Sequence, residues 1–155
     1  ICEATKKLTE NSLTNFKVLL TIDGKENKYS TDIVSKYHGI PQIQFIGLQK
    51  QQDLFALYGK VNCLIFPSKL ETWGLPITEF KVLQKPIILA NLKYAHETLG
   101  QYDKASFFEP DDSEELAQIM EREIKGENIY ILHKERPIKQ PYTKNWKELF
   151  EIIFK

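Results

Sequence analysis

The sequence has little cysteine, no long apolar run and no net charge. Its cysteines, Cys2 and Cys63, have neither the number for a disulfide framework nor the spacing of a zinc site, so reduced thiols in an intracellular protein are expected. The apolar stretch 61–67 is far shorter than the roughly 20 residues that span a bilayer, and no signal peptide is visible. Lysine and arginine number 21, as do aspartate and glutamate, so a nucleic-acid partner is not expected. The 155 residues suit one globular domain.

Short apolar runs alternate with helix-like segments along the chain. The runs are rich in β-branched and aromatic residues, and the segments between them carry apolar residues at helical spacing. This alternation is typical of a parallel sheet covered on both faces, an α/β fold. The expected strands are 16–22, 43–46, 62–66, 87–90 and 105–109, and the expected helices are 31–38, 51–59, 76–84, 95–100, 112–126 and 143–154.

Two of the expected helices carry specific signals. Asp112 followed by Glu115 predicts a capping box, and Gly126 predicts the end of the same helix. The last helix, 143–154, has one apolar stripe that is expected to pack on the domain, made of Trp146, Leu149, Phe150 and Ile153.

The stretch "ETWGLPITE", residues 71–79, follows the third expected strand. Open parallel sheets bind ligands at the carboxyl ends of their strands, and Pro76 suits the first turn of a helix. The amides of Ile77 and Thr78, with those of Gly74 and Leu75, would face an anion such as a diphosphate. Gly74 would let that anion approach the backbone closely.

The two carboxylates of this stretch, Glu71 and Glu79, are too far apart to act as one pair, because eight helical residues span about 12 Å. An acid beside a phosphate would repel it, so each carboxylate is better suited to neutral hydroxyls on either side of the anion. A nucleoside diphosphate sugar has this layout, with ribose at one end and a sugar at the other. The spacing therefore favours a nucleotide sugar as ligand.

The segment "SKLETWGLPITEFKVLQKPIILA" (68–90) resembles the E-x7-E signature of the retaining family 4 glycosyltransferases. The resemblance extends over nearly the whole chain. It implies a GT-B enzyme, in which a C-terminal Rossmann-like domain with a doubly wound parallel sheet binds the donor and an N-terminal domain binds the acceptor. Residues 1–155 would be the donor-binding half of a hexosyltransferase of polysaccharide or lipopolysaccharide biosynthesis.

The resemblance also implies roles for individual residues. Glu79 would bind the ribose, Glu71 would bind the donor sugar and serve as the catalytic residue, and the amides around Gly74 would bind phosphate or sugar. The base would lie near Gly47 and Leu48. The donor-binding set is completed by Thr72, Trp73, Leu75 and Thr78. No metal or cofactor is implied beyond a UDP or GDP sugar donor, whose leaving diphosphate would assist attack from the same face.

The chain departs from the family pattern at several places. Trp73 replaces a usual phenylalanine, Phe80 a usual alanine and Lys85 a usual glycine, and the loop at Gly24 keeps one glycine of a pair. The resemblance further implies that the family's first strand, a loop with an arginine and a lysine, and the acceptor domain would precede Ile1. The 155 residues alone are therefore expected to be inactive.

The expected partners are a nucleotide sugar and a glycan or lipid-linked acceptor, and the expected location is the cytoplasm. Residues 133–147 hold five basic residues and one acid, which favours a solvated tail over contact with an acceptor domain or the inner membrane surface. Two alternatives to a glycosyltransferase stay open. They are a sugar-nucleotide epimerase of the same fold and a non-catalytic nucleotide-binding or interaction module.

Overall fold

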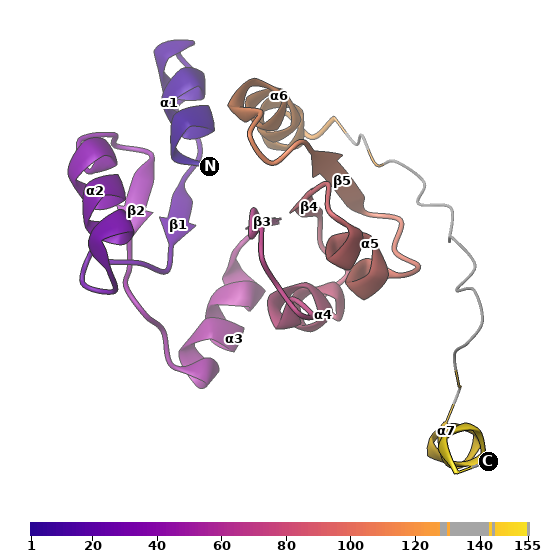
Figure 1. Cartoon of the computed structure of the whole chain (residues 1–155). Coiled ribbons are helices and arrows are strands. Elements are labelled where there is room, and N and C mark those ends of the chain that lie inside the picture. Colours follow the sequence, from indigo (N-terminus) through magenta and orange to yellow (C-terminus); the bar gives the residue numbers. More distant parts are fainter. Residues whose placement is uncertain (128–129, 131–142, 144, 155) are drawn as a thin grey trace.

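The structure is a computed structural model that describes residues 1–127, 130, 143 and 145–154. Strands and helices alternate through these residues, as the sequence predicts (Figure 1). The strands are β1 (Val18–Leu20), β2 (Ile43–Phe45), β3 (Leu64–Phe66), β4 (Ile87–Ala90) and β5 (Ala105–Phe108). The helices are α1 (Cys2–Glu10), α2 (Lys28–Tyr37), α3 (Gln51–Lys60), α4 (Leu75–Lys81), α5 (Lys93–Leu99), α6 (Ser113–Ile124) and α7 (Trp146–Ile153).

The strands of the described residues form two parallel sheets. β1 pairs with β2, and β3, β4 and β5 pair in that order. Between β1 and β3 lies an open cavity of about 1140 Å³, which both strands line along their full length. Neighbouring strands pair only at about 4.8 Å, so strands separated by such a cavity cannot share hydrogen bonds.

Helices cover both faces of the β3–β4–β5 sheet, which confirms the doubly wound arrangement. Successive side chains of a strand point to opposite faces, and β4 follows this rule. Its Ile87 and Leu89 pack in a cluster with residues of α3, α4 and α5, while Ile88 and Ala90 pack with residues of α1 and α6. Figure 1 shows α1 and α6 together on one side and α3 and α4 on the other.

Local signals explain where two helices begin. α2 begins three residues earlier than expected, because Asn27 and Ser30 form a capping box in which each side chain accepts a hydrogen bond from the other's backbone N–H. At α6, the Asp112 carboxylate accepts from the N–H groups of Glu114 and Glu115. The predicted reciprocal bond is wrong, because the Glu115 carboxylate accepts from the Glu109 N–H instead.

The expectation that the last helix packs its apolar stripe on the domain is also wrong. No residue of α7 is buried, and Trp146 is 74% exposed. Its aromatic residues contact one another at helical spacing instead, Trp146 with Phe150 and Phe150 with Phe154. Most of the basic segment 133–147 lies outside the described residues.

Candidate donor-binding site

The loop that carries Glu71 runs from Ser68 to Gly74 between β3 and α4, and helix α5 holds it at both ends. The hydroxyl of Tyr94 donates a hydrogen bond to the Ser68 carbonyl over 2.5 Å. The hydroxyl of Thr98, one turn further along α5, donates to the Trp73 carbonyl. The loop is therefore fixed by tertiary contacts, although Glu71 and Thr72 themselves are exposed.

Gly74 ends this loop in a conformation that favours glycine. Its φ is +73°, in the left-handed region, and it forms the N-cap of α4. A Cβ at this position would lie 3.0 Å from Ile77 Cδ1 and 3.4 Å from both the Phe66 and Tyr94 rings. The glycine therefore permits both the turn and the close packing beneath it.

The predicted anion site at the start of α4 is smaller than the sequence suggested. Helix α4 begins at Leu75, and the N–H of Ile77 is already bonded to the Gly74 carbonyl over 3.0 Å. The prediction that the Ile77 N–H faces a ligand is therefore wrong. Among the described residues, the N–H groups of Gly74 and Leu75 have no acceptor, so they remain candidates for binding a diphosphate, and the role of the Thr78 N–H stays a prediction.

Trp73 and Thr78 contact each other across Gly74. The indole Nε1–H donates a hydrogen bond to Thr78 Oγ1 over 3.1 Å, and Trp73 is 47% exposed. Of the expected site residues, this pair is the one that the structure joins directly by a side-chain hydrogen bond. Leu75 beside them is also exposed, so Trp73 and Leu75 present apolar surface next to the free amides.

Each of the two glutamates lies near a tyrosine from a neighbouring helix. Burial, and secondarily the negative charge of Glu71, raise the pKa of Tyr94 above its usual value. Tyr58 of α3 points its hydroxyl at Glu79 Oε2 over 3.5 Å. Burial, together with the charge of Glu79, raises the pKa of Tyr58 to about 12.

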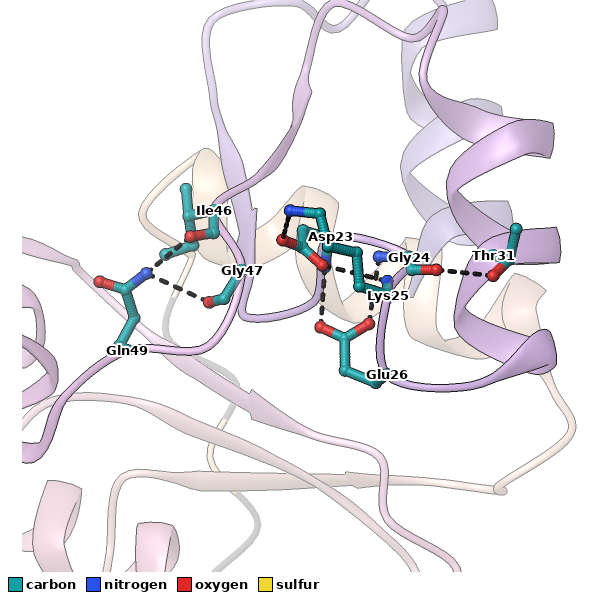
Figure 2. Close-up of polar contacts among 8 residues, drawn as sticks. All are labelled: Asp23, Gly24, Lys25, Glu26, Thr31, Ile46, Gly47 and Gln49. Carbon is teal, nitrogen blue, oxygen red and sulfur yellow. Dashed lines mark hydrogen bonds and ion pairs between the residues drawn. The ribbon is translucent and has the colours of Figure 1, made fainter.

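The loop after β2, expected to meet the base, is held by side chains (Figure 2). The Gln49 side-chain amide donates to the carbonyls of Ile46 and Gly47, over 2.7 and 3.1 Å. The Gly47 N–H donates to the Ile22 carbonyl over 3.2 Å, so that amide is not available to a ligand. Leu48 is 88% exposed, and the contact between Leu48 and a base stays a prediction.

Figure 2 also shows Gly47 beside the loop after β1, which carries Asp23. A Cβ on Gly47 would lie 3.4 Å from Asp23, and Gly47 has a φ of +67°. The Asp23 carboxylate binds Lys25 over 2.7 Å, and this hydrogen bond holds the pKa of Asp23 below its usual range. The Glu26 carboxylate accepts hydrogen bonds from the N–H groups of Asp23 and Gly24. The charged side chains of this loop therefore bind partners within the loop itself.

The cavity between the sheets reaches one residue of the candidate site. Its lining includes Leu48, Tyr58 and Pro76, from the loop after β2, α3 and α4, but not Glu71, Gly74 or Glu79. Leu48, expected to meet the base, therefore borders the same open space as Pro76 of α4. Sequence reasoning missed Tyr58 and Thr98, because each sits at an ordinary helical position with no motif around it.

The cysteines are free thiols, Cys2 buried and Cys63 half-buried. No helix in the described part of the chain combines the length and apolar character that crossing a bilayer requires.

Comparisons with known proteins identify the family. The family model described as "Glycosyl transferases group 1" matches residues 1–142, and the chain belongs to this family. Over 105 residues it is 29% identical to the serotype-specific mannosyltransferase WbdA and 23% identical to the O-antigen chain mannosyltransferase B, both from Escherichia coli. Each match covers 68% of this chain, but 13% of the first relative and 27% of the second.

The fold comparison agrees with the family. The chain is similar to a glycosyltransferase from Rickettsia africae ESF-5, with a TM-score of 0.66 and 26% identity, over 80% of this chain and 33% of that one. The GT-B glycosyltransferase class and the Rossmann-like α/β fold expected from the sequence are thus confirmed. The chain spans a minor part of each relative named here.

Proposed function

We propose that this chain binds the nucleotide-sugar donor of a retaining glycosyltransferase. The observation that carries the proposal is the arrangement around Gly74, with Glu71 before it on a loop fixed by α5 and Glu79 after it on α4. Glu79 would accept hydrogen bonds from the ribose hydroxyls and Glu71 from those of the sugar. The amides of Gly74 and Leu75 would bind the diphosphate between them.

Trp73, Thr72 and Thr78 would complete the sugar side of the site in this proposal. The Trp73 indole is oriented by its bond to Thr78, so its exposed face can pack on a sugar ring. Leu48 would contact the base through its exposed apolar side chain, beside the fixed carbonyl of Gly47. UDP and GDP are the nucleotides proposed.

In the reaction proposed, the bond between the anomeric carbon and the diphosphate oxygen breaks. The acceptor hydroxyl oxygen forms the new bond on the same face, and its proton passes to the departing diphosphate. The chain's own part is to hold the sugar through Glu71 and the diphosphate through backbone amides. The proposal requires no metal or other cofactor.

Mannose is the first donor sugar to test, because the relatives named above are mannosyltransferases. The acceptor proposed is a glycan or lipid-linked saccharide, met by a part of the protein other than this chain. Peripheral contact with the cytoplasmic face of the membrane belongs to the same proposal.

The test is a calorimetric panel of UDP, GDP, dTDP and ADP, each with and without an attached hexose. The proposal predicts that one nucleoside diphosphate binds and that the matching sugar adds affinity. A chain that binds none of them would contradict it. Release of an epimerised nucleotide sugar without an acceptor would favour the epimerase alternative.

The cavity between β1 and β3 supports a further part of this proposal, that one strand completes the sheet. In the described part of the chain, β1 and β3 each pair along one edge only, and the residues of both strands that line the cavity are apolar. Ile1 itself lines the cavity, so a strand leading into α1 would enter there. Such a strand, helix and neighbouring parallel strand make an ordinary crossover unit.

This part has its own test. Joining an apolar strand of about five residues ahead of Ile1 should raise the melting temperature, since the strand pairs with two open edges. The same segment with lysine at alternate positions is the control, because it would place charge against apolar side chains. An equal effect of the two segments would contradict strand insertion.

A further inference from the structure

Two residues that depart from the family pattern both contact Tyr58. Phe80 directly follows Glu79, is completely buried, and its ring meets that of Tyr58 at 5.3 Å and 90°. This edge-to-face contact is a favoured aromatic geometry. Because Tyr58 is only 5% exposed, its ring has little freedom to turn away from Glu79.

Lys85 fixes the helix that carries Tyr58. Its ammonium group donates to the carbonyls of Tyr58 (3.0 Å), Gly59 (2.7 Å) and Val61 (2.7 Å). These three bonds use all three ammonium donors. The positive charge also lies at the C-terminal end of α3, where the helix dipole favours a cation. Lys85 therefore holds the end of α3 against the segment between α4 and β4.

We propose that Tyr58 is a positioning residue for the Glu79 carboxylate, and that Phe80 and Lys85 hold Tyr58 in place for this purpose. The inference rests on the proposed ribose role of Glu79. The hydroxyl of Tyr58 donates a hydrogen bond to Glu79 Oε2 over 3.5 Å.

The chemistry of the carboxylate explains what this contact achieves. An ionised carboxylate has two oxygens and about four acceptor positions. Tyr58 occupies one position on Oε2, which leaves the others for the two neighbouring hydroxyls of a ribose. A glutamate side chain otherwise loses rotamer freedom when it binds, so holding it beforehand lowers the cost of binding.

The test compares ribose-containing and 2′,3′-dideoxy forms of UDP and GDP by calorimetry. The unmodified chain should prefer the ribose form, and Tyr58→Phe should reduce that preference by about twofold to tenfold, the range of one ordinary hydrogen bond. Binding of the dideoxy form should not change. A merely structural role for Tyr58 would weaken both forms alike, so the preference separates the two roles.

The chain offers matched controls. Tyr37 is 6% exposed and donates to Glu3 Oε2 over 2.6 Å, so Tyr37→Phe removes a similar tyrosine–glutamate contact away from the site. Lys85→Met should reduce the preference for the ribose form, as Tyr58→Phe does. Lys85→Arg should keep more of that preference than Lys85→Met does. Lys104 donates to the Gln84 carbonyl over 2.9 Å, so Lys104→Met is the control for loss of a lysine–carbonyl bond.

The double variant completes the test. If Tyr58 acts through Glu79, then Tyr58→Phe should have no effect on ribose preference once Glu79→Gln is present. Additive effects of the two substitutions would overturn the positioning role. An unmodified chain that binds nucleotide with no ribose preference would overturn the role of Glu79 itself. A preference that Glu79→Gln abolishes and Tyr58→Phe leaves intact would overturn only the inference about Tyr58.

Discussion

The indole nitrogen of Trp73 donates to Thr78 Oγ1 over 3.1 Å, and this bond ties the end of the loop to the first turn of α4. The peptide between them turns at Gly74, beneath which Ile77 packs tightly. The Trp73–Thr78 bond thus orients two side chains of the proposed donor site, while α5 holds the backbone of the loop through the carbonyls of Ser68 and Trp73. Substitutions at this turn should therefore change ligand affinity and the free energy of unfolding, and the two effects can be measured separately.

Gly74→Ala should destabilise the chain and weaken nucleotide binding. The new Cβ would lie 3.0 Å from Ile77 Cδ1 on a backbone with φ of +73°. Such strain costs about 1–3 kcal/mol. Gly59→Ala is the control, because a Cβ at Gly59, inside α3, would meet nothing within 4 Å. It should raise stability by about 0.5–1 kcal/mol. Urea unfolding of both variants measures this, and equal stability of the two would contradict the prediction.

Tyr94→Phe should loosen the loop that carries Glu71. The variant loses the hydrogen bond to the Ser68 carbonyl but keeps the ring that packs on Gly74. We expect a loss of about 1 kcal/mol in stability. The extra affinity that an attached sugar gives should fall. The affinity for the bare nucleoside diphosphate should stay unchanged. The control is Tyr37→Phe, which should lower stability and leave both affinities unchanged.

Glu123→Gln should stabilise the chain at neutral pH. Glu123 lines the cavity between β1 and β3, and burial raises the pKa of its carboxyl above the usual value. A carboxyl whose pKa is raised in the folded state contributes to stability at low pH. That stabilisation is lost as the pH rises through the folded-state pKa. The melting temperature should therefore rise by about 1–2 °C at pH 7, since solvent screens a half-buried group, and hardly at pH 4.

Glu121→Gln is the control for that measurement. The Glu121 carboxylate of α6 binds Lys125, the C-cap of that helix, over 2.7 Å, so its removal should not raise stability. A stabilising effect of Glu123→Gln that is the same at pH 4 and pH 7 would show that burial of the charge is not the cause.

Much of the fold could be predicted from the sequence. The strand 87–90 was predicted with the bounds that the structure gives, because all four of its residues are buried and its pattern is continuously apolar. The strand expected at 16–22 is shorter, Val18–Leu20, since only these residues pair with β2. The apolar stripe of α7 predicted packing, but an amphipathic pattern states which face is apolar and not which surface covers it.

The candidate site was predicted less completely. The E-x7-E stretch and its glycine could be recognised because they are contiguous. The partner of Glu79 could not, because Tyr58 lies 21 residues away and only the packing of α3 on α4 brings them together. Lys85 and Phe80 looked like simple departures from a pattern, and the structure gives both a contact with Tyr58. Such tertiary contacts have no local sequence signal.

The central claim is that the two glutamates bind opposite ends of one ligand. Calorimetry of Glu71→Ala and Glu79→Ala, each with a bare nucleoside diphosphate and with its sugar conjugate, tests it most directly. Glu79→Ala should weaken both ligands by about tenfold to a hundredfold, the range of a charged hydrogen bond. Glu71→Ala should leave the bare diphosphate nearly unchanged and remove the added affinity of the sugar. Equal losses for both ligands in both variants would contradict the claim.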